Sequence, residues 1–184
     1  MITVISGTNR PASRTLLVAE ALAAAIRRAG EEARVLDLAK LDFDHFSEGM
    51  YAGGTITPAL RAIQEQYVLD VQKLAFVLPE YNGSFPGFLK LFIDGISVNE
   101  YNRNFRGKTI SLTGVASGRA GNLRGLDHLA ACLNYLGGWV LPNKLPLSSV
   151  EGLLNAEGEL TDKAALAALN EQALQLIAAR NRNL

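Results

Sequence analysis

Short apolar segments alternate with longer amphipathic segments along most of the chain. Residues 2–6 are apolar at nearly every position, as expected for a central strand that is covered on both faces. Residues 13–29 follow with apolar side chains at helical spacing, and Gly30 marks the end of that helix. This alternation predicts βα units arranged around a parallel sheet.

The same reasoning predicts four further strands and four further helices. The strands are expected at residues 33–38, 73–78, 108–116 and 139–141. The helices are expected at residues 60–70, 88–98, 121–136 and from the Thr161-Asp162 cap to about Arg180. Residues 40–57 are interpreted as a loop and residues 142–158 as irregular structure. In a doubly wound sheet of this kind, ligands bind beyond the carboxyl ends of the strands, so the loops there are expected to carry the chemistry.

Composition and charge narrow the class of protein. The chain has 184 residues, of which 48% are hydrophobic and 20% are charged, which is ordinary for a globular domain. Its 18 basic and 18 acidic residues balance, so no overall field attracts nucleic acid or an anionic membrane. The N-terminus lacks the basic region and cleavage site of a signal peptide, and no segment reaches the ~20 apolar residues of a membrane span. We expect one cytoplasmic domain over residues 1–184.

The loop after the first predicted strand has the composition of a phosphate site. It reads Gly7-Thr8-Asn9-Arg10-Pro11-Ala12-Ser13-Arg14-Thr15 and leads directly into a helix. Helix N-termini offer unpaired N–H groups and partial positive charge, to which hydroxyls and an arginine fork add donors. Taken alone, the loop is equally consistent with Ser13 as a simple helix cap and with solvated arginines.

Better-known nucleotide and hydrolase motifs are missing. The dinucleotide fingerprint G-x-G-x-x-G does not follow any predicted strand, and the hydrolase motif G-x-S-x-G does not occur. Gly107-Lys108-Thr109 looks like the end of a Walker A loop, but it precedes a strand and Asn102 replaces the earlier glycine. His45 and His128 lie far apart without other ligands at metal-binding spacing, so we expect no metal site. For His128, packing or an interface is favoured over catalysis.

Two further loops carry a family resemblance. Residues 79–90 read Pro-Glu-Tyr-Asn-Gly-Ser-Phe-Pro-Gly-Phe-Leu-Lys, and residues 116–124 read Ala-Ser-Gly-Arg-Ala-Gly-Asn-Leu-Arg. Together with the first loop, they resemble the signatures of NADPH-dependent FMN reductases, which include bacterial quinone, chromate and azo-dye reductases. The likeness extends in order over roughly residues 2–142.

The resemblance implies a flavodoxin-like three-layer fold, with five parallel strands in the order 2-1-3-4-5. It implies FMN as cofactor, with NAD(P)H as co-substrate that passes hydride through flavin N5 to a quinone, free flavin or another small oxidised acceptor. It also implies a homodimer or homotetramer. No catalytic side chain is required, because the chemistry takes place on FMN. The alternatives are a non-enzymatic flavodoxin-type electron carrier, disfavoured by the neutral charge, and a flavin-sensing module.

The loop chemistry fits a flavin independently of the family. Glycines at 83 and 118 lack a Cβ and permit close approach of the chain to a flat ring, which Tyr81 can flank. Arg119 is a candidate for a dinucleotide phosphate, although a solvated arginine is an equally good interpretation. The expected cofactor-binding residues are Thr8, Arg10, Ser13, Arg14, Thr15, Pro79, Glu80, Tyr81, Asn82, Gly83, Ser117, Gly118, Arg119 and Gly121.

Overall fold

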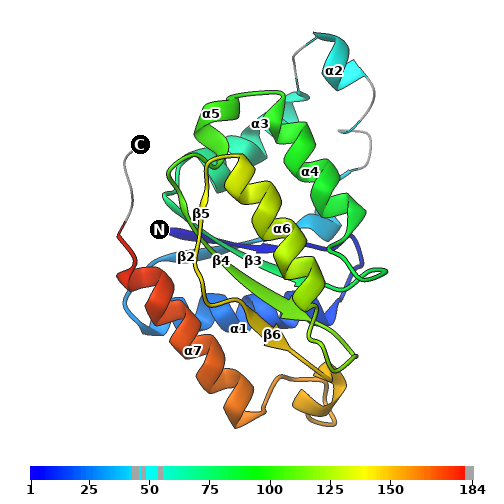
Figure 1. Ribbon diagram of the computed structural model, residues 1–184, viewed down its shortest axis with the longest axis vertical. Helices are drawn as coiled ribbons and strands as arrows, with labels where there is room; N and C mark the ends of the chain where they lie inside the picture. The colour runs from blue at the N-terminus through cyan, green and yellow to red at the C-terminus, as the bar shows by residue number, and fades with distance from the viewer. Residues whose placement is uncertain (43–45, 47–48, 54–55, 181–184) are drawn as a thin grey trace.

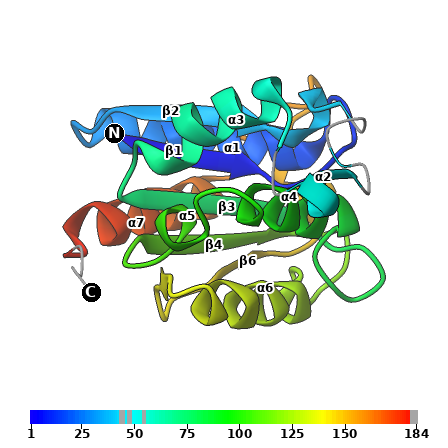
Figure 2. The same ribbon diagram turned by 90° about the horizontal axis from the view of Figure 1, so that it is seen from above.

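A parallel sheet forms the middle layer of the molecule, with helices on both of its faces (Figure 1). The computed structural model describes residues 1–42, 46, 49–53 and 56–180. The strands are β1 (Ile2–Ser6), β2 (Ala33–Asp37), β3 (Lys73–Pro79), β4 (Thr109–Val115), β5 (Trp139–Val140) and β6 (Leu145–Leu147). Figure 2 shows the sheet from above, and its order β2-β1-β3-β4-β5 confirms the flavodoxin-like prediction.

The helices on the two faces of the sheet differ in length. They are α1 (Arg14–Arg28), α2 (Gly49–Gly53), α3 (Pro58–Gln64), α4 (Gly87–Ser97), α5 (Tyr101–Asn104), α6 (Leu123–Tyr135) and α7 (Lys163–Ala178). Short 3-10 turns, η1 (Leu38–Lys40) and η4 (Val150–Leu153), and a π-helical turn, η3 (Glu65–Leu69), complete the described elements. No helix in the described ranges is long and apolar enough to cross a membrane.

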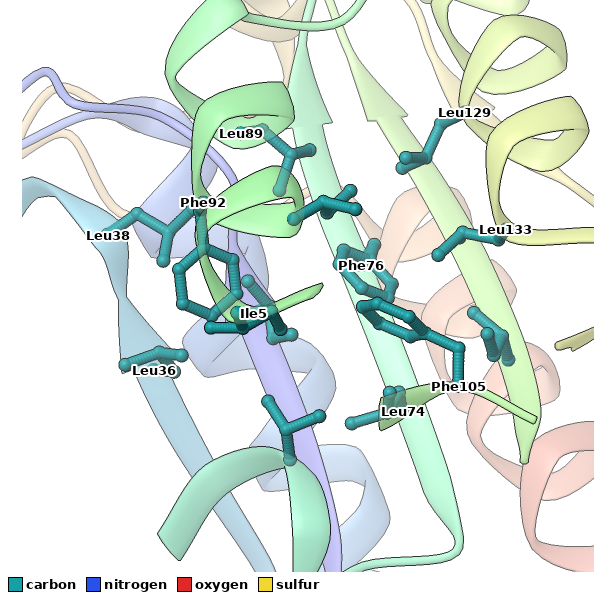
Figure 3. Close-up of a cluster of buried hydrophobic side chains, with 14 of the residues drawn as sticks. Ile5, Leu36, Leu38, Leu74, Phe76, Leu89, Phe92, Phe105, Leu129 and Leu133 are labelled. Carbon is teal, nitrogen blue, oxygen red and sulfur yellow. The ribbon is translucent and has the colours of Figure 1, made fainter. Parts of the chain in front are cut away.

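Alternate side chains of the central strands pack into two separate cores. Figure 3 shows the core between the sheet and helices α3 to α6, where Ile5, Phe76 and Leu129 are fully buried. The opposite core lies against α1 and α7 and contains Val4 and Val77. Burial on both faces explains why these strands read as continuous apolar runs.

The segment 142–158, expected to be irregular, contains regular structure. β6 pairs with β4 at residues 113–115, so the sheet has a sixth strand off the main path, and η4 follows it. β6 reads Leu-Pro-Leu and is too short for a periodic pattern. Its proline is compatible with an edge strand, where a missing N–H is tolerated. The predicted loop at 40–57 likewise contains α2, and η1 ends at its first residue.

β5 and β6 form one interrupted edge strand, and a side chain from α7 bridges the interruption. Leu141 N–H donates to the Ile110 carbonyl, and Ala116 N–H donates to the Leu147 carbonyl further along. Between these points the Leu112 carbonyl accepts from Gln172 Nε2 at 2.9 Å. The Thr113 hydroxyl donates to the Gln172 amide oxygen. The buried glutamine thus satisfies the Leu112 carbonyl, which a continuous edge strand would have paired, and the buried hydroxyl of Thr113.

Replacing this glutamine is expected to destabilise the fold. Gln172→Met retains the length of the side chain but leaves buried donor and acceptor groups without partners, which costs about 1–3 kcal/mol. Urea unfolding followed by circular dichroism measures the loss. Gln175→Met on the same helix, whose hydrogen bonds are exposed, serves as the control and should change the unfolding free energy by less than about 0.5 kcal/mol. Equal effects of the two substitutions would contradict the assignment.

Candidate functional site

A cavity of about 470 Å³ lies where the loops after β1, β3 and β4 meet at the carboxyl edge of the sheet. The strands β1, β3 and β4 are parallel neighbours, so their carboxyl ends bring the three loops together. The turn η4 closes the remaining side. The wall of the cavity is formed by Thr8, Arg10, Pro11, Ala12, Ser13, Arg14, Thr15, Pro79, Glu80, Tyr81, Val115, Ala116, Ser117, Gly118, Val150 and Glu151.

The loop after β1 presents a helix N-terminus to this cavity. Ser13 caps α1 by accepting from the Leu16 N–H at 3.1 Å. The first turn of α1, which lies wholly in the described chain, contains no acidic residue, while Arg10 and Arg14 are exposed beside it. Positive charge and the amino end of a helix dipole therefore act on the same part of the wall, which favours an anion such as a phosphate.

Thr8 is a buried residue of this wall. Its side chain is fully buried, and its Oγ1 accepts from the Arg10 N–H at 3.2 Å. The same oxygen lies 2.8 Å from the hydroxyl of Tyr81, which comes from the loop after β3. Thr8 thus connects two of the three loops.

The loop after β3 begins as a tight hairpin. Tyr81 and Ser84 exchange two backbone hydrogen bonds of 2.9 and 3.1 Å, and Asn82 and Gly83 between them both have positive φ, 54° and 76°. This geometry matches a type I′ turn, for which Asn-Gly is a preferred pair. Ser84 Oγ also lies 3.0 Å from His128 Nδ1 of α6. The hairpin is therefore attached to the helix beside it.

The side chain of Asn122 anchors the start of the same loop. Asn122 is fully buried with φ of 65°, and its Nδ2 donates to the carbonyl of Pro79 at 2.8 Å and of Leu78 at 3.2 Å. These are the last carbonyls of β3. The anchor fixes the position from which the residues 80–84 depart.

The loop after β4 folds back over its own strand. A Cβ at Gly114 would lie 2.2 Å from the Gly121 carbonyl oxygen, and one at Gly121 would lie 2.6 Å from Pro146 Cβ. Gly121 therefore serves the packing of this loop between β4 and β6. Gly118 lies in the cavity wall instead, and the described residues leave at least 4 Å free around a Cβ placed there.

Glu151 adds a carboxylate that the sequence reasoning did not assign. Its Oε1 accepts from Ser117 Oγ at 3.0 Å and lies 3.5 Å from Arg14 Nε. Its own backbone N–H and Ser117, with a smaller contribution from Arg14, hold the pKa of this carboxyl below its usual value. Glu151 therefore stays negative in the wall and links α1 to the loop after β4.

The structure brings most of the predicted residues together. The cavity wall includes Thr8, Arg10, Ser13, Arg14, Thr15, Pro79, Glu80, Tyr81, Ser117 and Gly118. The other four predicted residues lie outside the wall. Asn82 and Gly83 form the tip of the hairpin, and Gly121 is buried in the packing of its loop. Arg119 is exposed, and its carbonyl accepts a hydrogen bond from the Ser148 hydroxyl. The wall residues that sequence reasoning missed are Pro11, Ala12, Val115, Ala116, Val150 and Glu151. Ala12 has φ of 50°, a strained value that no sequence pattern signals.

Lys108 lies at the amino end of β4, at the edge opposite the cavity. It is buried, and its Nζ donates to the carbonyls of Val71 and Val68. Burial, followed by the charge of Arg103, lowers the pKa of Lys108 to about 8. The Walker-like tripeptide therefore lies away from the cavity, and the ammonium of its lysine is directed to the carbonyls of Val68 and Val71. Among the described residues, no three His, Cys, Asp or Glu side chains gather at metal-binding distance, and His45 lies outside them.

The wall fits FMN. The amino end of α1 with two arginines suits a dianionic phosphate, the open space at Gly118 admits a flat ring close to the backbone, and Tyr81 offers an aromatic flank. The wall contains two carboxylates, Glu80 and Glu151. Glu151 is paired with Arg14 and Ser117, which reduces its repulsion of an anion.

Comparison with known proteins points to the same cofactor. A family model described as NADPH-dependent FMN reductase matches residues 1–152. An NAD(P)H-dependent FMN reductase of Pseudomonas aeruginosa is 35% identical over 142 residues, which are 74% of each chain.

Solved structures show the likeness of the fold. The flavoenzyme NAD(P)H:(acceptor) oxidoreductase FerB of Paracoccus denitrificans has a TM-score of 0.75 at 20% identity, covering 96% of this chain and 94% of its own. The apo form of the NADH:FMN oxidoreductase EmoB has a TM-score of 0.74 at 20% identity, covering 100% and 94%.

Gly118 allows a test of the ring's place that leaves the protein's own packing intact. Gly118→Ala adds a methyl group that meets nothing in the described protein within 4 Å, so thermal stability should stay unchanged. If FMN lies against this backbone, its dissociation constant measured by fluorescence quenching should rise about tenfold or more, equivalent to roughly 1.4 kcal/mol.

Gly87→Ala is the matched control. It also has open space around the added Cβ but lies outside the cavity wall, so FMN binding should be unaffected. Wild-type affinity in Gly118→Ala would place the ring elsewhere.

Proposed function

Because the chain belongs to the NADPH-dependent FMN reductase family, we propose that it transfers reducing equivalents from NAD(P)H to a quinone, free flavin or another small oxidised molecule at this cavity. In the quinone case, NAD(P)H, one proton and the quinone yield NAD(P)⁺ and the hydroquinone. The observation that carries the proposal is the meeting of three loops at one edge, with an anion-binding helix end beside an open glycine backbone.

When bound, FMN supplies a ring that accepts hydride and returns electrons. The contribution of the protein is then to bind, orient and shield. Arg10, Ser13, Arg14 and Thr15 are proposed to hold the phosphate at the start of α1. The backbone of residues 79–81 and 117–118 is proposed to border the ring, with Tyr81 along its side. Hydroxyl, amide and guanidinium groups suffice for these tasks, so no catalytic acid or base is assigned.

Glu151 has a defined effect on hydrogen-bond direction in this arrangement. Ser117 Oγ donates its single proton to the Glu151 carboxylate, so the lone pairs of Ser117 remain available to accept. Ser117 would therefore accept a hydrogen bond from a ligand N–H. Arg119, exposed on the same loop, is proposed to meet a phosphate of the nicotinamide substrate at the rim.

The acceptor is tested by anaerobic turnover. NADPH or NADH should bleach the visible absorbance of the FMN-loaded protein, and addition of a quinone or free flavin should restore it and sustain NAD(P)H oxidation. The class of acceptor that gives the highest kcat/KM is assigned as substrate. Bleaching without faster reoxidation by either class would contradict the proposal, and a persistent one-electron flavin species would favour an electron carrier.

We also propose that the enzyme is a homodimer or homotetramer that works in the cytoplasm, where NAD(P)H is supplied. Tyr135 and Trp139, at the end of α6 and the start of β5, expose 84% and 39% of their surface, which supports an apolar contact there. Sedimentation analysis should give a mass of two or four chains, and Tyr135→Glu should lower it. A monomer at all concentrations would contradict this assembly.

A further inference from the structure

A hydrogen bond between the hydroxyls of Tyr81 and Thr8 links the loop after β3 to the loop after β1. Their oxygens are 2.8 Å apart, although the residues are separated by 73 positions in the chain. Thr8 is fully buried and Tyr81 is half-buried, so water competes weakly for this bond. Both residues line the cavity.

The link continues through the backbone into the loop after β1, residues 7–15, which is proposed to bind the phosphate and is called the phosphate loop. Thr8 Oγ1 accepts from the Arg10 N–H at 3.2 Å, which fixes the turn that carries Arg10 into the wall. A hydroxyl oxygen has two lone pairs and one proton, so Thr8 serves Arg10 and Tyr81 together whichever of the two hydroxyls donates. A change at Tyr81 is therefore transmitted to the turn at residues 8–10.

The two ends of the link differ in how firmly they are held. The hairpin that carries Tyr81 is fixed by two backbone bonds to Ser84, by His128 and by Asn122 at its base. The phosphate loop has four consecutive exposed residues, 9–12, and includes the strained φ of 50° at Ala12. The hairpin is thus the support, and the phosphate loop is the part that needs one.

We propose that Tyr81 is a positioning residue whose hydroxyl holds the phosphate loop in its binding conformation through Thr8. The hydrogen bond then couples the position of the loop assigned to the ring to the position of the loop assigned to the phosphate. The inference rests on the proposed function, because it assumes that FMN occupies this cavity. It predicts that loss of one hydroxyl, on the loop assigned to the ring, weakens recognition of the phosphate.

Tyr81→Phe tests this by comparing FMN with riboflavin, which has the same ring and no phosphate. Phenylalanine keeps the aromatic flank and removes only the hydroxyl. Calorimetry should show FMN binding weakened about 3- to 10-fold, the range expected for one net hydrogen bond, and riboflavin binding changed less than about twofold. A purely structural or ring-stacking role would change both ligands alike.

Variants at Thr8 complete a double-mutant cycle. Thr8→Val keeps the shape and removes the hydroxyl, so it should lower the preference for FMN over riboflavin at least as much as Tyr81→Phe. Adding Tyr81→Phe to Thr8→Val should change that preference no further, because the shared bond is already gone. Thr8→Ser should restore it. Tyr101→Phe, at an exposed position on α5 outside the cavity wall, is the control and should leave both affinities unchanged.

The outcomes separate this inference from the proposed function. Equal weakening of both ligands in Tyr81→Phe, unchanged FMN affinity, or additive losses in the double variant would overturn the role of Tyr81 while FMN binding stands. Failure of the wild type to bind FMN would overturn both. Circular dichroism checks that each variant folds. If Tyr81→Phe does not fold, the ratio of FMN affinity to riboflavin affinity in Thr8→Val, compared with that in Thr8→Ser, decides the question.

Discussion

The parallel pairing of β1, β3 and β4 is the constraint on which the site depends. In register, Ser6 lies beside Val77 and Val77 beside Thr113, so the three strands run side by side and finish at one edge. Because parallel strands all point the same way, the loops that follow them leave the sheet together, and helices must cover both faces to bury the strands. The cavity is a consequence of this pairing and of the loops that follow it.

Hydrogen bonds between the loops fix the positions of the residues that form the cavity wall. Gly7 N–H donates to the Val77 carbonyl, Asn122 holds the end of β3, and Glu151 joins Arg14 to Ser117. Each of these interactions connects segments that lie far apart in the sequence. The wall is therefore determined by long-range contacts, and its polar groups are arranged before any ligand enters, which lowers the ordering that binding requires.

The strands and most helices were predictable because their signal is local. Ile2–Ser6 was predicted with its observed bounds, and Ser13 and Asp162 are the caps that their positions suggested. β6 was missed because a three-residue edge strand containing Pro146 has no periodicity and exists only through pairing with β4. Glu151 was missed for a related reason, since only the folding of η4 against α1 brings it to Arg14. The role of Gly121 likewise depends on Pro146, which is 25 positions away and invisible to a local pattern.

Direct titration of FMN into the purified wild-type chain tests the central claim, that the three loops at the carboxyl edge form one flavin site. Isothermal calorimetry should give one FMN per chain, and a crystal of the complex should place the phosphate at the amino end of α1 with the ring between the loops after β3 and β4. Absence of measurable FMN uptake, or a flavin bound away from this edge, would contradict the account.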